Sequence, residues 1–250
     1  MSIAALYDVH GNLPALEAVL DEAESEGVER IVCGGDVVTG PMPAETLERL
    51  LALGDRAVVL RGNADREAVA VAHGSQQAGE WPGPRDAWSI GRLGPKHLDA
   101  IEALPETVTL DVAGLGPVLF CHATPRSDEE VFLEDTPVEV VEPMLAGAGA
   151  TVVVCGHTHM QFDRRVGSLR VINAGSVGMP YEAAPGAYWA LLGPDAELRR
   201  TAYDLEGEAD AIRATGWPAA EEFVRENLLA VPSRAEAHAA FEPLVERPAP

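Results

Sequence analysis

Short apolar runs recur along the chain, and helical patterns separate the first few of them. The runs have the length and the β-branched content of buried strands. We predict strands at residues 2–7, 30–33, 57–60, 117–121 and 151–155. Between the first of these, the spacing of leucine and valine predicts amphipathic helices at 13–23 and 44–53. This alternation of strand and helix favours βαβ units around a buried sheet.

The pattern changes in the second half of the chain, where candidate strands are joined by short turns instead of helices. These strands lie at 161–166, 169–173, 187–192 and 197–203. They predict a second, more antiparallel sheet. Residues 74–95 are rich in glycine and proline, which predicts a long loop with Trp81 and Trp88 as its anchors.

The C-terminal part returns to helical spacing over 206–245, interrupted by Pro218 and Pro232, before a Pro-rich tail. We therefore predict a main domain over 1–205 and a helical C-terminal appendage over 206–250 that packs on the same domain. With 250 residues, 47% of them hydrophobic, the chain is long enough to bury one substantial core.

Charge and hydropathy narrow the choice of partners. The chain has 40 acidic and 18 basic residues and a formal net charge of −22, which disfavours a nucleic-acid groove or an anionic membrane surface. It contains no apolar run of the roughly 18 residues that span a bilayer, and the basic start of a signal peptide is missing. We expect a cytoplasmic protein whose three cysteines are reduced strand thiols. The sequence does not predict whether the protein is a monomer or an oligomer.

Polar residues with metal-binding side chains follow most of the predicted strands. One such residue after a strand is commonly a turn or capping residue. Seven of them at the carboxyl ends of strands, where open α/β sheets place their ligand sites, are better explained by a shared metal site. They are Asp8, His10, Asp36, Asn63, His122, His157 and His159.

The motifs Asp-x-His, Gly-Gly-Asp, Gly-Asn-x-Asp, a lone His and Gly-His-Thr-His occur in this order from Asp8 onward. In this they resemble the calcineurin-like metallophosphoesterase superfamily, and most closely its compact bacterial and archaeal phosphodiesterase branch. The match includes the later segment Asn-Ala-Gly-Ser-Val-Gly at 173–178. The resemblance implies an α/β fold, a four-layer α/β/β/α sandwich of two β-sheets flanked by helices.

The resemblance also implies two divalent transition metals, Mn, Fe, Ni or Zn, that share one carboxylate. One metal would be held by Asp8, His10, Asp36 and His159. The other would be held by Asp36, Asn63, His122 and His157. A hydroxide bridging the two metals, roughly 3.5–4 Å apart, would attack the phosphoester. Asp8, Asp36, Asn63 and His122 are then the expected catalytic residues.

One position departs from the family pattern. Members with Gly-Asn-His-Asp or Gly-Asn-His-Glu use this histidine as a general acid or electrophile, and here the residue is Ala64. An alanine cannot donate a proton, so we expect phosphodiesters, nucleotides among them, to be better substrates than alkyl phosphomonoesters. His73 or His97 could replace the missing acid, although both are typical surface histidines.

Three further residues are candidates for contact with a small phosphorylated substrate, together with Asn63. Arg126 follows His122 closely, and its alternative role is that of a solvated loop arginine. Asn173 and Ser176 lie in a glycine-rich turn whose alternative role is a plain strand connection.

Two other functions remain open on the same scaffold. One is a phosphomonoesterase or protein phosphatase, against which Ala64 weighs. The other is a non-catalytic scaffold such as the retromer subunit of this superfamily, which loss of ligands would favour.

Overall fold

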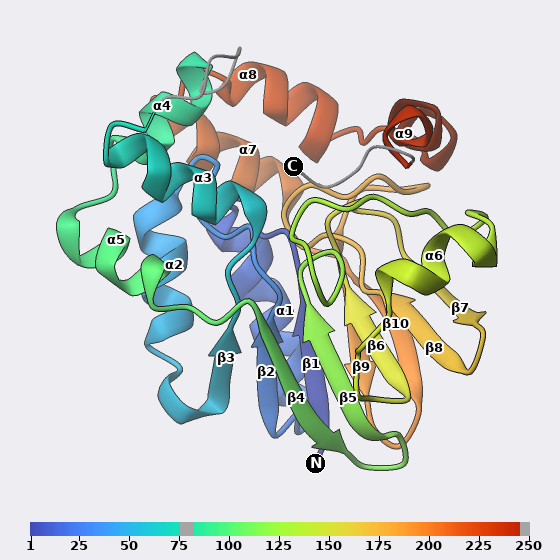
Figure 1. The fold of residues 1–250 in the computed structure, drawn as a ribbon. Coiled ribbons are helices and arrows are strands. Elements are labelled where there is room, and N and C mark those ends of the chain that lie inside the picture. The colour runs from blue at the N-terminus through green and yellow to red at the C-terminus, as the bar shows by residue number, and fades with distance from the viewer. Residues whose placement is uncertain (76–82, 246–250) are drawn as a thin grey trace.

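Two five-stranded β-sheets lie face to face between layers of helices (Figure 1). The computed structural model describes residues 1–75 and 83–245. The first sheet has the order β10-β9-β1-β2-β3 and the second β4-β5-β6-β8-β7. The first sheet comprises β1 (Ile3–Leu6), β2 (Arg30–Cys33), β3 (Ala57–Val59), β9 (Ala187–Leu192) and β10 (Ala196–Thr201). The second comprises β4 (Thr107–Val112), β5 (Gly116–Cys121), β6 (Val152–Cys155), β7 (Phe162–Val166) and β8 (Leu169–Asn173).

Alternation of side chains along the strands divides the core into layers. In β1, Ile3 and Ala5 face the core between the sheets, whereas Ala4 and Leu6 face the helices. The helices on this outer face are α1 (Leu13–Ser25), α2 (Pro43–Leu51), α3 (Asn63–Ala72), α4 (Pro84–Ile90) and α5 (Pro95–Glu102). On the second sheet, α6 (Val138–Met144) packs against β5, β6 and β7. This is the expected four-layer α/β/β/α sandwich.

The predicted division of strands between the sheets is wrong for one hairpin. β9 and β10 extend the first sheet, because β9 pairs antiparallel with β1. Only β7 and β8 join the second sheet, where β8 runs parallel to β6. The sequence of β9, which is apolar on both faces, suits a central position next to β1: Trp189 packs toward the helices and Ala190 toward the other sheet.

The predicted loop over 74–95 is also partly wrong, because α4 forms within it. Pro84 stands in the first turn of this helix, where its fixed φ and missing N–H are tolerated. Trp88 packs against an apolar cluster of the C-terminal helices, as expected of an anchor. Trp81 lies outside the described residues. Strand β4 and helices α3, α5 and α6 have no counterpart among the predicted elements.

The C-terminal segment is helical, as predicted. It forms α7 (Leu205–Ala214), α8 (Ala220–Phe223), a π-helical turn over Val224–Leu228, and α9 (Arg234–Phe241). One apolar cluster joins α7, α8 and the π turn to Met42 and Met179, and a smaller one joins α9 to Leu133 and Met160. The division of the chain at residue 206 stays a prediction.

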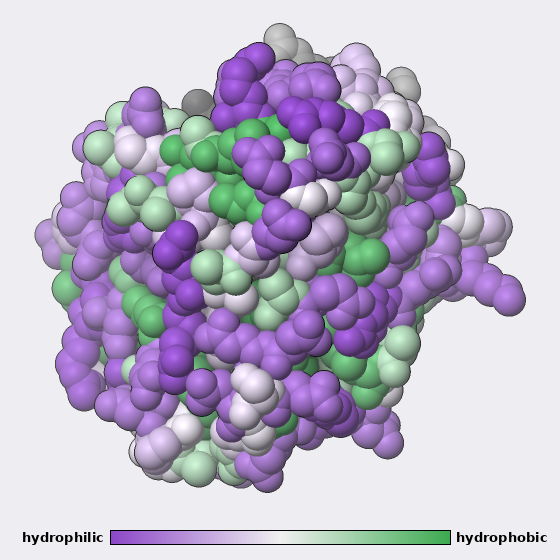
Figure 2. All heavy atoms as spheres, turned by 180° about the vertical axis from the view of Figure 1, so that it is seen from behind, coloured by the Kyte–Doolittle hydropathy of each residue, from purple (hydrophilic) through white to green (hydrophobic). Residues whose placement is uncertain are grey.

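The three cysteines are free and buried, as expected. The face shown in Figure 2 is mostly hydrophilic with scattered apolar patches, in keeping with the abundance of acidic residues. Among the described residues, no helix combines the length and the apolar character that crossing a membrane requires.

Candidate metal centre

The seven candidate ligands lie together at one edge of the two sheets. Asp8 and His10 follow β1, Asp36 follows β2, and Asn63 follows β3 as the first residue of α3. In the second sheet, His122 follows β5, and His157 and His159 follow β6. Because β1, β2 and β3 run parallel, as do β5 and β6, their carboxyl ends meet at this edge.

The backbone of these strand ends is unusual. Positive φ angles of 46° to 66° occur at five of the seven candidate ligands, and at no other non-glycine residue of the described ranges. These five are Asp8, His10, Asp36, His157 and His159. Left-handed backbone is unfavourable for most L-residues, less so for Asp, Asn and His, and such strain concentrates at functional sites.

Two glycines make room for the carboxylates. A Cβ atom on Gly62 would lie 2.2 Å from Asp36 Oδ1, and one on Gly156 would lie 2.5 Å from Asp8 Oδ2. Both contacts are shorter than any tolerated by real side chains. The glycine that precedes Asn63 and the glycine that precedes His157 therefore let these segments approach the aspartates.

One group of donor atoms gathers around Asp8. The side chains of Asp8, His10 and His159 each offer an atom within 4.8 Å of the others. His159 Nε2 lies 3.5 Å from Asp8 Oδ1 and 3.1 Å from His10 Nε2. Asp8 Oδ1 is buried and accepts no hydrogen bond from the described residues, a costly situation unless a cation compensates it.

A second group shares Asp8 and adds Asp36 and His122. Asp36 Oδ2 lies 3.6 Å from His122 Nε2 and 4.0 Å from His10 Nε2, so this oxygen stands between the two groups. Asn63 Oδ1 lies 3.0 Å from His122 Nε2. The ring centroids of His157 and His122 are 5.1 Å apart, but the nitrogens of His157 are not among the atoms within 4.8 Å of one another.

Hydrogen bonds on the far side of the rings orient two histidines. Nδ1 of His122 donates to the Gly34 carbonyl at 2.9 Å, and Nδ1 of His159 donates to the Met179 carbonyl at 2.7 Å. Because Nδ1 carries the proton in each case, Nε2 is left to bind a metal. Nδ1 of His10 lies 3.0 Å from the Thr39 hydroxyl. The sequence does not predict these hydrogen-bond partners, because two of them are main-chain carbonyls.

Burial and mutual charge shift the pKa values in this cluster. Burial lowers the pKa of His10 and of His157 to about 3, so both rings are neutral at pH 7, as a metal ligand must be. Burial raises the pKa of Asp36 to about 7. Burial also acts to raise the pKa of Asp8. The neighbouring histidines, His159 first, outweigh this effect and hold the pKa of Asp8 well below its usual range.

Asp65, the last residue of the Gly-Asn-x-Asp motif, supports the site without being a candidate ligand. It is buried, and its carboxylate accepts the backbone N–H groups of Val37, Val38 and Gly62 at 2.8–3.1 Å. These bonds join the turn after Asp36 to the start of α3, and they fix Asp36 relative to Asn63. The sequence does hold a sign of this structural role. An aspartate at the third position of a helix can accept a hydrogen bond from the backbone N–H of the residue that precedes the helix, here Gly62.

The side chains predicted to touch substrate have partners within the protein. Asn173 donates to the Gly156 carbonyl at 2.7 Å, and its Oδ1 accepts from Gly175 N. The Ser176 hydroxyl donates to the Asp8 carbonyl at 2.7 Å. These bonds hold the segments that carry His157 and Asp8. Arg126 is exposed and paired with Glu130, and its contact with substrate stays a prediction.

Neither candidate for a substitute acid is hydrogen-bonded to the cluster. His73 pairs with Glu102 of α5, and His97 Nε2 lies 2.9 Å from Glu48 of α2. Ala64 lies beside the site, where its backbone N–H donates to Asp36 Oδ1 at 2.9 Å.

Comparison with known proteins agrees with this geometry. The chain is 27% identical over 231 residues to protein MJ0912 of Methanocaldococcus jannaschii, covering 84% of this chain and 91% of that one. It is 26% identical over 200 residues to phosphodiesterase YfcE of Escherichia coli, covering 76% and 87%. The structure of a metallophosphoesterase from Sphaerobacter thermophilus superposes with a TM-score of 0.68, at 26% identity, over 90% of this chain and 97% of that one.

The model of the calcineurin-like phosphoesterase superfamily domain matches residues 1–194. This span includes both sheets except for β10, and it contains all seven residues of the cluster. The chain therefore belongs to the calcineurin-like phosphoesterase superfamily.

Proposed function

We propose that this protein is a phosphodiesterase that depends on two divalent metals held by the seven-residue cluster. The observation that carries the proposal is the convergence of metal-binding side chains around a buried Asp8 oxygen that no donor within residues 1–75 and 83–245 satisfies. Neutral imidazole nitrogens and carboxylates are the ligands that Mn, Fe, Ni and Zn accept. The donor set therefore fits the group that the family implies.

We assign the ligands to two metal positions as the family resemblance implies. Asp8, His10 and His159 would hold one metal, which agrees with the short distances among their donor atoms. His122, Asn63 and His157 would hold the other, and both Asn63 and His157 lie next to His122. We assign Asp36 to both positions because its Oδ2 approaches one histidine of each group. Bound there, the two cations would neutralise phosphate charge and lower the pKa of a water nucleophile.

The remaining residues of the site position the ligands and select the substrate. Asp65, Asn173 and Ser176 fix the three turns that carry the aspartates and histidines. At Ala64 a methyl group stands where family members with Gly-Asn-His-Asp or Gly-Asn-His-Glu have a histidine, so the leaving group must depart without protonation from this position. We infer a preference for diesters with stabilised leaving groups, which agrees with the name of the relative YfcE.

The test compares substrates on protein freed of metal with a chelator and reloaded with Mn, Fe, Ni or Zn. We expect bis(p-nitrophenyl) phosphate to be hydrolysed only after reloading, and faster than glycerol phosphate. Asp36→Asn should abolish activity and lower metal content, whereas Asp55→Asn on the surface should change neither. Faster hydrolysis of the alkyl monoester would contradict the preference for diesters. Protein without stoichiometric metal or hydrolysis would favour the scaffold function.

A further inference from the structure

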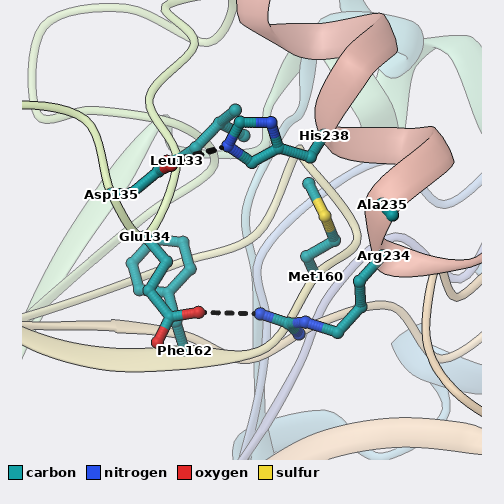
Figure 3. A pocket seen from close by; sticks show the side chains of 8 residues that line it. All are labelled: Leu133, Glu134, Asp135, Met160, Phe162, Arg234, Ala235 and His238. Atoms are coloured by element: carbon teal, nitrogen blue, oxygen red, sulfur yellow. Dashed lines mark hydrogen bonds and ion pairs between the residues drawn. The ribbon is translucent and has the colours of Figure 1, made fainter.

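A pocket lies between α9 and the edge of the second sheet (Figure 3). Its volume is about 300 Å³, the lower end of the range for small-molecule sites. Leu133, Met160 and Phe162 form its apolar floor, each of them only 2–4% exposed, and Ala235 lines it from α9. The pocket can therefore take one small group with an apolar face.

The pocket shares an edge of the sheet with the candidate metal centre. Phe162 begins β7 opposite Asn173, the last residue of β8, and Asn173 also pairs with Cys155 at the end of β6. Met160 directly follows His159 in the chain. Phe162 thus lies at the end of the sheet from which the histidine segment of the cluster leaves.

Tyr181 connects the two places. Its ring stacks on His159 with centroids 4.8 Å apart, and it packs with Leu133 and Met160 in the small cluster beneath α9. An aromatic contact with Phe241, 6.2 Å between centroids, extends this packing to the end of α9. The wall of the pocket is thereby attached to a candidate metal ligand.

Two ion pairs form the polar part of the pocket. Arg234 bonds Glu134 at 2.9 Å, and His238 Nε2 lies 2.8 Å from Asp135, as the dashed lines in Figure 3 show. Both carboxylates are largely exposed and keep free lone pairs, so they can accept further N–H donors. Each basic side chain of the pocket is already paired with a carboxylate, so the pocket offers no unpaired positive charge to an anionic group.

We propose that this pocket binds an amino-bearing nucleobase of the substrate, while the phosphoester lies at the metal cluster. A planar base offers a flat face for Met160 and Phe162 and N–H donors for the carboxylates of Glu134 and Asp135. The inference rests on the proposed function and names its substrate class, a nucleotide ester. It also assigns a function to α9, which lies beyond the part of the chain that the family model matches.

The first measurement is equilibrium binding, which requires no catalysis. Titration calorimetry compares adenosine monophosphate with ribose phosphate, which lacks the base. We expect the nucleotide to bind at least about tenfold tighter, as burial of one aromatic ring with its hydrogen bonds can supply. Equal affinities would overturn the inference.

A matched pair of variants locates the effect. Ala235→Phe places a ring in the pocket, whereas Ala240→Phe adds the same ring to an exposed part of α9 that does not line it. We expect Ala235→Phe to remove the preference for the nucleotide and Ala240→Phe to retain it. Circular dichroism and the Tm of both variants confirm that each is folded. A preference that survives in Ala235→Phe would also overturn the inference.

Hydrolysis separates this inference from the proposed function. The p-nitrophenyl esters of adenosine monophosphate and of methyl phosphate share one leaving group, and Ala235→Phe should lower kcat/KM for the adenosine ester alone. If the protein hydrolyses both esters at equal kcat/KM, the pocket inference fails and the phosphodiesterase remains. If it hydrolyses neither while binding stays dependent on the base, the proposed function fails and the pocket remains.

Discussion

Replacement of Glu208 by glutamine should remove a pH-dependent loss of stability. Glu208 lies in α7 and is 3% exposed, and neither of its carboxylate oxygens accepts a well-formed hydrogen bond from the described residues. The side chains of Tyr203 and Asn12 lie near it and offset part of the effect of burial on its pKa. Burial raises the pKa of this carboxyl from 4.5 to about 8. The folded protein therefore favours the neutral acid.

The direction of the effect follows from the two pKa values. The carboxyl in the unfolded chain loses its proton near pH 4.5, whereas in the folded protein it keeps the proton up to about pH 8. The contribution to stability is fully present below pH 4.5 and is lost as the pH rises toward 8. Between about pH 5 and pH 7 the loss is roughly 2–3 kcal/mol, at about 1.4 kcal/mol per pH unit.

Urea unfolding of the metal-free protein at these two pH values measures the effect, because bound metal would add a pH dependence of its own. Glu208→Gln should lose roughly 2–3 kcal/mol less than the wild type between the two values. Glu206→Gln, an exposed change on the same helix, should behave as the wild type. Parallel pH profiles for all three proteins would refute the reasoning.

Three further predictions concern the site. Ala64→His should raise kcat for phosphomonoesters by roughly 10²-fold, measured on metal-loaded protein, and an unchanged kcat would show that this position does not reach the leaving group. Gly156→Ala should destabilise the fold by about 1–3 kcal/mol in urea unfolding, because its methyl group meets Asp8 Oδ2; full stability would contradict the packing argument. Asn173→Ala should lower stability by about 1–3 kcal/mol through its lost bonds to Gly156 and Thr158, whereas a raised KM at full stability would indicate direct substrate contact.

The sequence predicts elements whose signal is local. The strands β1, β2 and β6 are short apolar runs, and α1 has one apolar stripe, so each was placed to within two residues. The sheet that β9 joins is determined by its pairing with β1, which lies near the other end of the sequence: Ala190 pairs with Ala5. Hairpin spacing fixes the β9–β10 pair but carries no information about that third strand.

The sequence predicts the candidate ligands of the site, but it does not predict the hydrogen-bond partners that orient them. Asp8, Asp36 and His157 were found because each follows an apolar strand, which is a pattern in the chain itself. The Met179 carbonyl that orients His159 is a main-chain atom and leaves no trace in residue type. The pocket under α9 likewise depends on Arg234 and His238 meeting residues about a hundred positions earlier.

The left-handed backbone at five of the candidate ligands affects how they should be mutated. Aspartate, asparagine and histidine tolerate this conformation better than other non-glycine residues, and they are also residues that coordinate metals. An alanine scan here would remove a ligand and add roughly 1–2 kcal/mol of backbone strain at each position, so it would report two effects as one. Substitution by asparagine preserves the turn while it removes the charge of an aspartate or the imidazole of a histidine, so it changes the ligand with little added backbone strain.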